Sequence, residues 1–469
     1  MRFRGGLPEP IVEIYKRFNK SGYDLYLIGG AVRNLLLKEN MLDYADLKDW
    51  DLTTNAKPEE MMKLFPNAFY NNQFGTVGIP TQNDLNEKFV VEVTTFRSES
   101  EYEDRRHPTK VTWGKSIEED LKRRDFTINA IAAKLLPLGN QPALNNVEII
   151  DLHDGKKDLE NKIVRAVGDP KQRFKEDALR LLRAVRIATE LSFTIEERTW
   201  KEIIADAPLI AKVSGERIRI ELLRILTSDY AYEGIMSLKN SGLLEYILPE
   251  LLKGEGISQE RPGRHHKSDV FTHNVLSLKF CPSTDPIVRF ATLLHDVGKP
   301  KVMGKDEEGL IIFHNHEIAG AKIAREICDR LKFSKKDREK IVNLIRWHMF
   351  TVDEKITDAA VRRFIRRVGV ENVKDMMDLR IGDRLGGGTQ TAESWRLKLF
   401  RKRVEEQLLP APFSINDLAV DGNDVMKILN IKPGPKIGEI LQKLFEEVDE
   451  DLSKNTKEYL LERIRELSK

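Results

Sequence analysis

The chain has 469 residues, 41% of them hydrophobic and 32% charged, which is typical of a globular protein with two to four domains. No apolar run approaches the roughly 20 residues that cross a bilayer, so no membrane span is expected. The two cysteines, Cys281 and Cys328, cannot form a disulfide framework, and the first residues lack the apolar stretch of a secretory signal. These features predict a cytoplasmic protein. The 77 basic and 75 acidic residues give a net charge of +2, which neither requires nor excludes a nucleic-acid partner.

Short β-rich runs, such as LYLIGG, KFVVEVTTF and NVEIIDL, alternate with helical stretches between Tyr23 and Val167. This alternation predicts a mixed α/β domain. From Phe174 onward, apolar residues recur at intervals of three and four, which predicts an all-α remainder. Breaks in this helical pattern lie near KGEGISQERPG, GDRLGGGTQ and NIKPGPKIG. We therefore predict four domains, over residues 1–167, 168–260, 261–386 and 387–469.

Two aspartates follow a glycine turn in the order LYLIGGAVRNLLL, then DWDLTT. We expect a strand, the pair Gly29 and Gly30, a helix, and a second strand whose alternation points Asp49 and Asp51 to one face. Paired carboxylates suit Mg²⁺, which takes its other ligands from water and substrate phosphates. The glycines would let the backbone approach a triphosphate, and Arg33 would add a cation. Each signal is weak alone, because most Asp-x-Asp pairs are polar loops, but their order favours a metal and phosphate site.

A third carboxylate lies farther along the chain, in the strand-like run VVEVTTFR. Glu92 could join the aspartates if its strand runs beside theirs. It could equally be an outward-facing surface charge, and the sequence leaves both interpretations open.

The segment GDPKQRFKEDALRLLRAVRIATELSF predicts a single helix. In it Asp177, Arg180, Arg183 and Arg186 recur every third residue and would form a ridge with one acidic and three basic groups. The ordinary interpretation of such a ridge is salt bridging on a wet surface, worth about 0.3 to 0.5 kcal/mol per pair.

Seven of the nine histidines lie between His265 and His348. An adjacent His-Asp pair in the apolar run LLHDVGKP is hard to explain by packing alone. Imidazoles and carboxylates together suit a divalent or transition metal, and helices can gather distant ligands in a bundle core. The candidates are His273, His295, Asp296, His316, His348 and Asp383, whereas His265, His266 and His314 are expected outside the ligand set. The alternative is a metal-free scaffold for RNA.

GGAVRN and DWD resemble the opening of the class II tRNA nucleotidyltransferase and bacterial poly(A) polymerase family, in which Gly-Gly-x-Val-Arg-Asp precedes Asp-x-Asp. Asn34 departs from the family's aspartate. TTFRSESEYEDRRHPTKVTW resembles the family's flexible loop, DLKRRDFTINAIA its second motif and DLHDGKKDLENKIVRAVG its third. The resemblance implies that Arg124 binds the triphosphate, while we expect Asp125 and Asn129 to brace the fold.

Glu176, Asp177 and Arg180 match the Glu-Asp-x-x-Arg motif that selects the nucleotide in this family. Cytosine and adenine both offer an amino donor beside a ring-nitrogen acceptor, so Asp177 could accept and Arg180 could donate. Uracil and guanine instead present a carbonyl acceptor beside a ring N–H, so acceptor would face acceptor and donor would face donor. Each such buried mismatch would weaken binding by about 1 to 3 kcal/mol. By resemblance, Arg183 and Arg186 bind the triphosphate or support the motif, and Arg217 belongs to the next motif.

The histidine block resembles the HD phosphohydrolase superfamily. This resemblance implies a metal site of His273, His295, Asp296 and Asp383, with His316 and His348 as the additional histidines of binuclear members. A phosphatase or cyclic-phosphodiesterase activity is a weaker hypothesis than metal binding, because metal binding alone does not define a substrate. The tail LAVDGNDVMKILNIKPGPKIGEILQKLFEEV resembles the C-terminal segment of HD-containing family members.

Taken together, the resemblances imply an α/β nucleotidyltransferase head with a polymerase-β-like mixed sheet, followed by all-α neck, HD and tail domains. The implied activity is template-independent addition of CCA to tRNA from CTP and ATP. Its cofactor would be Mg²⁺, with a second divalent or transition metal in the HD domain. We expect tRNA, CTP and ATP as partners, and no membrane or obligate protein partner.

Three alternatives stay open at this level. An enzyme adding only A, only CC, or a poly(A) tail would share the core motifs, although the intact loop disfavours the CC-adding enzyme, and the HD region disfavours the poly(A) polymerase. An HD-type metal phosphohydrolase is an alternative of a different class. A purely structural RNA-binding protein would need neither carboxylate site.

Overall fold

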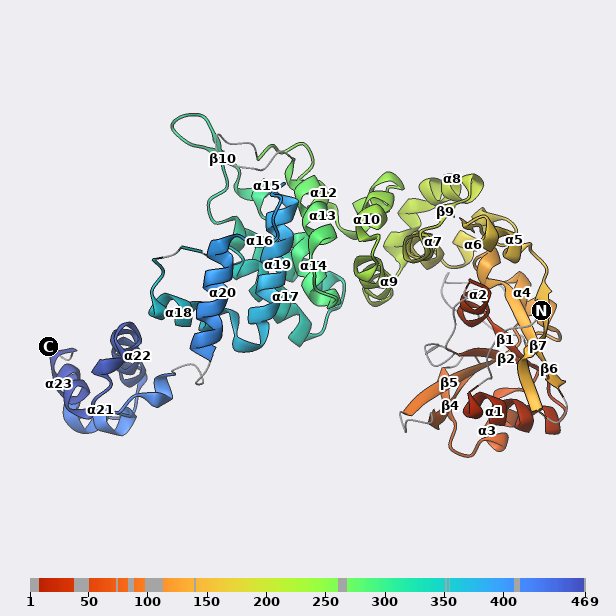
Figure 1. The fold of residues 1–469 in the computed structure, drawn as a ribbon, viewed down its shortest axis with the longest axis horizontal. Coiled ribbons are helices and arrows are strands. Elements are labelled where there is room, and N and C mark those ends of the chain that lie inside the picture. The colour runs from red at the N-terminus through yellow and green to blue at the C-terminus, as the bar shows by residue number, and fades with distance from the viewer. Residues whose placement is uncertain are drawn as a thin grey trace. The chain divides into compact units, whose positions relative to one another are not determined.

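The computed structural model describes residues 8–37, 50–72, 75–82, 88–97, 113–138, 141–259, 268–350, 352–353, 355–408 and 414–467. Asp49, residues 98–112 of the predicted flexible loop, His265 and His266 lie outside these residues. The chain forms two units, Met1–Pro249 and Glu250–Lys469, and each is described by itself (Figure 1).

Seven strands of the first unit form one mixed sheet in the order β3-β4-β5-β2-β1-β6-β7. They are β1 (Leu25–Ile28), β2 (Asp51–Thr54), β3 (Phe69–Asn72), β4 (Thr76–Gln82), β5 (Lys88–Thr95), β6 (Ile131–Leu138) and β7 (Gln141–Asp151). Only β2 and β5 run parallel among these neighbours. Every residue of β1 is buried, as expected for a central strand covered on both faces. The predicted α/β fold with a mixed sheet is confirmed.

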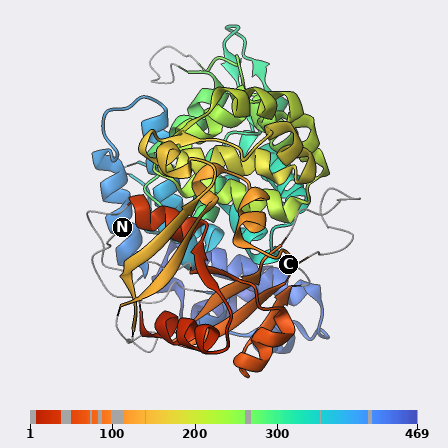
Figure 2. The ribbon, with the colours of Figure 1, turned by 90° about the vertical axis from the view of Figure 1, so that its right-hand side faces the viewer.

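Five helices of the first unit accompany the sheet: α1 (Glu9–Lys20), α2 (Gly30–Leu37), α3 (Pro58–Leu64), α4 (Ile117–Lys122) and α5 (Gly155–Glu160). α1 lies against β1 and β7 (Figure 2) and its Tyr15 hydroxyl donates a 2.8 Å hydrogen bond to the carbonyl of Leu135. On α4, Ile117 and Leu121 pack in one core cluster with Tyr26 of β1. Tyr26 pairs with Thr53, so α4 covers the β1 side of the face on which Asp51 lies.

A helical region completes the first unit, with α6 (Pro170–Glu176), α7 (Leu179–Leu191), α8 (Glu197–Asp206), α9 (Gly215–Thr227), α10 (Ala231–Asn240) and α11 (Leu243–Ile247). A short parallel pair, β8 (Ile163–Val164) and β9 (Thr194–Ile195), joins its start. The prediction of a single helix over 168–193 is wrong, because the chain breaks at Asp177, whose backbone is extended at φ −146° and ψ 105°. The Asp177 carboxylate accepts the backbone N–H of Leu179, 3.1 Å away, and this local bond favours a new helix start over continuation.

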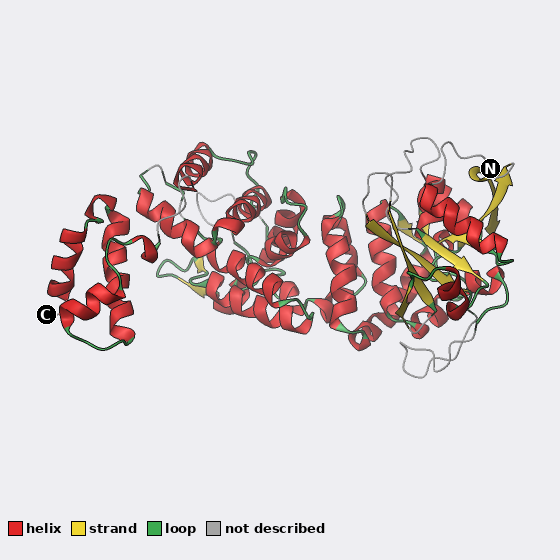
Figure 3. Ribbon diagram, turned by 90° about the horizontal axis from the view of Figure 1, so that it is seen from below, coloured by secondary structure: helices red, strands yellow, loops and turns green. Residues whose placement is uncertain are grey.

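The second unit is mostly helical (Figure 3), as predicted, with one small hairpin of β10 (Gly304–Lys305) and β11 (Ile311–Ile312). Its helices include α12 (Pro249–Leu252), α13 (Val270–Phe280), α14 (Pro286–Leu294), α15 (Lys299–Val302), α16 (His316–Arg330), α17 (Lys335–Trp347), α18 (Asp358–Val368), α19 (Val373–Gly386) and α20 (Trp395–Leu408). α13 and α19 pack very closely, since a Cβ at Gly386 would stand 2.3 Å from Ser277 Oγ. Glycine at this position therefore lets α19 bring its neighbour Asp383 toward α13.

The last three helices, α21 (Gly422–Leu429), α22 (Pro435–Glu450) and α23 (Lys457–Leu467), share their own apolar core, which includes Leu444, Val448 and Leu460. The buried carboxylate of Asp449 on α22 accepts hydrogen bonds from two arginines of α18. The chain divides into two compact units, so the division into four domains stays a prediction. Among the described helices, none combines the length and apolarity that a membrane crossing requires.

Candidate active sites

Asp51 and Glu92 are neighbours across the parallel pair β2 and β5. Directly paired residues point to the same face of a sheet, so the two carboxylates lie side by side on one exposed surface. The strand of Glu92 thus does run beside that of Asp51. Asp49 lies outside the described residues, and its part in the site stays a prediction.

The glycine turn after β1 gathers the other groups of this site. Gly29 has a φ of +67°, a conformation that glycine adopts without strain. A Cβ at Gly29 would stand 3.0 Å from Arg124 Nη1 and 3.5 Å from Asp51 Oδ2, while one at Gly30 would stand 3.7 Å from Arg33 Nη2. Two guanidinium groups and a carboxylate therefore surround a backbone turn that has no side chains of its own.

Two neutral amides hold the side chain of Arg33. Its Nη1 donates to Asn129 Oδ1 at 2.9 Å, and its Nε and Nη2 donate to Asn34 Oδ1 at 3.2 and 3.1 Å. Burial lowers the pKa of Arg33 below its ordinary value, although a guanidinium keeps its proton. Asn34, which departs from the family's aspartate, thus orients Arg33 without cancelling its positive charge.

Asp120 on α4 positions Arg124, and sequence reasoning missed it. Its carboxylate bonds Arg124 Nη2 at 3.2 Å and Arg123 Nη2 at 2.5 Å. Burial raises the pKa of Asp120, but the charges of Arg123 and Arg124 outweigh burial and lower the pKa to about 2. The sequence did contain a signal for these ion pairs, because Asp120 precedes Arg123 and Arg124 by the three and four residues that bring side chains together on a helix.

Asp177 and Arg180 lie close in sequence but have separate partners. Arg217 on α9 donates two hydrogen bonds to the Asp177 carboxylate, of 3.1 and 2.7 Å. Arg180 donates to Glu176 Oε2 at 2.6 Å and to the carbonyl of Arg123 at 3.1 Å. A carboxylate has about four acceptor positions, so Asp177 retains acceptors beyond those that Arg217 uses.

Arg183 and Arg186 enter buried ion pairs. Arg183 donates to Asp125 Oδ2 at 2.9 and 2.7 Å, and Arg186 Nε lies 2.8 Å from Glu221 Oε2 on α9. Burial raises the pKa of Asp125, but Arg183 and Arg180 outweigh it and hold the pKa well below its usual range. Asp125 also lies 3.5 Å from the amide of Asn129, so this network ties the sheet domain to α7 and α9.

A second site lies in the other unit, where buried histidines and aspartates meet. Two groups of three could each hold a metal ion, namely His273 with His295 and Asp296, and Asp296 with His316 and His348. Asp296 belongs to both, with Oδ2 3.3 Å from His295 Nε2 and Oδ1 3.2 Å from His316 Nε2. Asp383 Oδ1 lies 3.2 Å from His273 Nε2. The structure thus brings together all six ligands predicted for this unit, while exposed His314 lies outside the cluster.

Backbone carbonyls fix the orientation of three of these rings. Nδ1 of His295, His316 and His348 lies 2.8, 2.9 and 2.7 Å from a carbonyl oxygen, which can only accept. Each Nδ1 must therefore donate, and a neutral ring then turns the lone pair of Nε2 toward the cluster. The Nε2 atoms of His316 and His348 are only 3.3 Å apart, so their lone pairs repel unless a proton or a metal cation lies between them.

The spacing and charge of the cluster fit a metal. Two ligands about 2.1 Å from one ion, at an angle near 100°, are about 3.2 Å apart. Burial lowers the pKa of His295, but Asp296 and Asp383 outweigh it and raise the pKa to about 10. The same negative potential would attract a divalent cation.

Lys299 adds a positive group beside the cluster that sequence reasoning did not identify. Its Nζ lies 2.5 Å from Asp296 Oδ2 and 2.5 Å from Gln259 Oε1. The sequence signal for it was its place three residues after Asp296 in HDVGK, at the end of the turn between α14 and α15.

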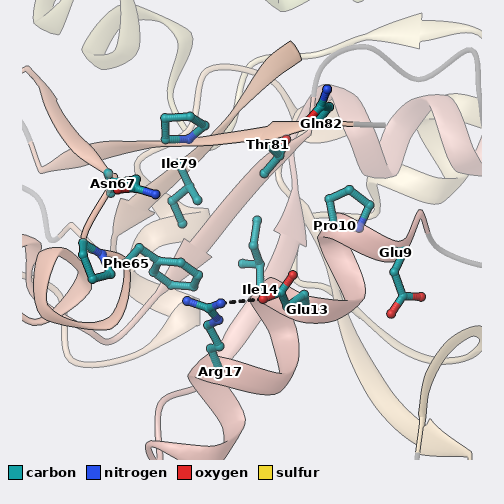
Figure 4. A pocket seen from close by; sticks show the side chains of 13 residues that line it. Glu9, Pro10, Glu13, Ile14, Arg17, Phe65, Asn67, Ile79, Thr81 and Gln82 are labelled. Atoms are coloured by element: carbon teal, nitrogen blue, oxygen red, sulfur yellow. Dashed lines mark hydrogen bonds and ion pairs between the residues drawn. The ribbon is translucent and has the colours of Figure 1, made fainter. Parts of the chain in front are cut away.

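The first unit also contains a pocket of about 410 Å³ (Figure 4). Ile79 and Thr81 of β4 line it together with Glu13, Arg17 and Phe65. Ile79 pairs with Val91 and not with Glu92, so its side chain points to the face opposite Asp51. This pocket therefore does not belong to the candidate nucleotide site.

Comparison with known proteins agrees with this geometry. Residues 25–165 match the Poly A polymerase head domain, residues 192–254 the RNA- and SrmB-binding site of polymerase A, and residues 309–464 the tRNA nucleotidyltransferase domain 2. The chain is 36% identical to the A-adding tRNA nucleotidyltransferase of Deinococcus radiodurans over 71% of this chain and 75% of that protein. It is 29% identical to the CCA-adding enzyme of Limosilactobacillus reuteri over 98% and 97%. The Bacillus stearothermophilus CCA-adding enzyme, solved in complex with CTP, superposes with a TM-score of 0.71 at 25% identity, over 98% of this chain and 97% of that one.

Proposed function

Since the chain belongs to the family of tRNA nucleotidyltransferases and poly(A) polymerases, we propose that it adds CCA to the 3′ end of tRNA from CTP and ATP, without a template. The observation that carries this proposal is that Asp51 lies between Glu92, its partner on β5, and the Gly29 turn, which Arg124 also approaches. The CCA-adding enzyme of Limosilactobacillus reuteri matches over almost its full length. Because the relative at 36% identity adds A, an A-adding or CC-adding specialist or a poly(A) polymerase is the alternative.

Asp49 and Asp51 would hold Mg²⁺, with Glu92 as the third carboxylate. The family implies a divalent metal, and exposed paired carboxylates on one sheet face are the oxygen donors that Mg²⁺ prefers. When bound, the metal lowers the pKa of the attacking hydroxyl and neutralises charge on the phosphoryl and leaving oxygens.

The triphosphate would lie on the Gly29 and Gly30 turn, between Arg33 and Arg124. The absence of side chains on the turn admits phosphate oxygens, and both guanidinium groups already stand within contact distance of it. The RNA 3′-hydroxyl would attack the α-phosphate, and pyrophosphate would leave toward the arginines. No covalent enzyme intermediate is required.

Asp177 and Arg180 would read the pairing edge of the incoming base. Asp177 would accept the amino group of cytosine or adenine, and Arg180 would donate to the ring nitrogen. We assign Arg183 and Arg186 to support of the motif, because both are held by buried carboxylates. Arg217 would position Asp177.

The test is incorporation of each labelled nucleoside triphosphate into tRNA transcripts that end before CCA, after C and after CC, with Mg²⁺ present. CCA addition requires two CTP additions followed by one ATP. Addition of ATP only to the CC transcript indicates an A-adding enzyme, and long A-tracts indicate a poly(A) polymerase. No incorporation with any transcript contradicts the proposal.

The histidine cluster favours a second candidate function, an HD-type metal-dependent phosphohydrolase. His273, His295, Asp296 and Asp383 would hold one metal, and Asp296 would share a second with His316 and His348. The opposed Nε2 lone pairs favour this over a metal-free scaffold. Phosphate release from 2′,3′-cyclic nucleotides by the wild type but not by Asp296→Ala supports hydrolysis. Its absence under several divalent metals counts against it.

Location and domain boundaries complete the proposal. We propose tRNA, CTP and ATP as partners in the cytoplasm. The head is assigned to residues 1–167, the neck to 168–260, the HD domain to 261–386 and the tail to 387–469. Limited proteolysis with mass spectrometry of the fragments tests these boundaries.

A further inference from the structure

A row of residues crosses four strands on the face that carries Asp51. The register pairs Phe69 of β3 with Gly78 of β4, Gly78 with Glu92 of β5, and Glu92 with Asp51 of β2. Paired residues share a face, so an aromatic ring and two carboxylates stand on one surface. The glycine between them carries no side chain.

Phe69 and Val90 form an apolar patch on this surface. Phe69 is 43% exposed and Val90 is 43% exposed. The Phe69 ring lies over the glycine, because a Cβ at Gly78 would stand 2.6 Å from its Cζ and 3.0 Å from Val90 Cγ1. Neither side chain is required to fill the core, and a large exposed aromatic group beside a catalytic surface suggests a binding role.

The phosphate-binding groups lie on the opposite side of Asp51. In the sheet, β2 is flanked by β1 on one side and by β5 on the other. Gly29 follows β1 directly, and Arg124 contacts this turn, so the triphosphate would lie on the β1 side. In phosphoryl transfer the attacking and leaving oxygens are roughly in line on opposite sides of phosphorus. The RNA 3′ end must therefore approach from the β5 side, where Phe69 and Val90 lie.

The distance fits a short stretch of single-stranded RNA. Neighbouring strands are about 4.8 Å apart, so Gly78, under the ring, stands about 10 Å from Asp51. Stacked nucleotides rise about 3.4 Å each, and two or three of them span roughly this distance. The ring would then meet the second or third base from the reacting end.

We propose that Phe69, backed by Val90, is a stacking platform for the second or third base from the 3′ end of the RNA substrate. The inference rests on the proposed nucleotide addition and names the residues that hold its acceptor strand. Every base has a π-face, so an aromatic ring binds unpaired nucleotides without reading their identity. One platform could thus serve each successive addition.

Steady-state kinetics of three variants tests this platform. Phe69→Ala should raise the KM for tRNA on the order of tenfold, while the KM for CTP stays unchanged. Phe69→Trp should restore the KM for tRNA, because it keeps an aromatic face. The matched control is Tyr70→Ala, whose side chain is also exposed but points to the other face, since it pairs with Val77. An unchanged KM for tRNA in Phe69→Ala, or an equal rise for CTP, overturns the proposal.

Photocrosslinking tests the contact independently of turnover. A tRNA transcript with 5-iodocytidine as its second base from the 3′ end, and a second transcript with it as the third, should crosslink to the peptide containing Phe69. Crosslinks only to other peptides overturn the platform even if nucleotides are incorporated normally. If the wild type incorporates nothing yet crosslinks at Phe69, the proposed addition fails while the RNA contact stands.

Discussion

Replacement of Arg217 by methionine should loosen the choice of nucleotide without abolishing catalysis. Arg217 donates two charge-assisted hydrogen bonds to Asp177, of 3.1 and 2.7 Å, and without them the carboxylate keeps the bond from the backbone N–H of Leu179. Methionine keeps the apolar stem and removes both donors. Asp177 could then rotate, and its acceptor would no longer be preorganised for an amino group.

The expected size follows from the exposure of the pair. The side chains of Arg217 and Asp177 are 30% and 25% exposed, so water weakens an interaction that would be stronger if fully buried. We expect a loss of about 1 to 2 kcal/mol in discrimination, or a 5- to 30-fold fall in selectivity for CTP over UTP.

The assay is the ratio of kcat/KM for CTP to that for UTP on a transcript ending before CCA. Arg217→Lys is the matched control, because it keeps the charge but cannot make the bidentate contact, and it should give an intermediate ratio. An equal fall of kcat/KM for both nucleotides would assign Arg217 to triphosphate binding and refute the positioning role. An unchanged ratio in both variants would refute it as well.

Other predictions address the carboxylates, stability and metal content. Asp51→Asn should lower incorporation of every nucleotide by roughly a thousandfold, whereas Asp177→Ala should mainly change base choice; comparable selectivity and residual activity in the two variants would contradict the assignment. Asp120→Asn should destabilise the first unit by roughly 2 kcal/mol at pH 7, measured by urea denaturation, because the native pKa of about 2 lies below the ordinary 3.8. This stabilisation is present above pH 3.8 and is lost as the pH falls toward 2, so wild type and variant should converge in acid; a constant difference would exclude the linkage. His316→Ala should lower the divalent metal content, measured by inductively coupled plasma mass spectrometry, by one ion per chain, whereas the exposed control His314→Ala should keep the wild-type content.

The order of motifs was enough to predict an α/β domain followed by helices, and to name the six side chains that the structure gathers in the second unit. The helix prediction from apolar periodicity failed where a side chain replaces a backbone hydrogen-bond partner. Apolar periodicity runs through Asp177, so the sequence suggests one continuous helix. The carboxylate instead accepts the N–H of Leu179 and bonds Arg217, forty residues away, and the helix ends.

Residues whose role depends on register or on distant partners could not be found from the sequence. Phe69 belongs to an ordinary strand pattern until its pairing with Gly78 places it on the carboxylate face, where Val90 lies two residues before Glu92 on β5. Asp296 was expected as a ligand, but only the fold shows that one carboxylate serves two groups of histidines. Lys299 gains significance in the same way, because its partner Gln259 lies forty residues earlier.

The most direct test of the central claim is the mass of the product formed from a tRNA transcript lacking CCA, with all four nucleoside triphosphates and Mg²⁺ present together. We expect a single product, longer by two cytidylates and one adenylate, and no further extension. A product that contains uridylate or guanylate, a poly(A) ladder, or an unextended transcript would contradict it.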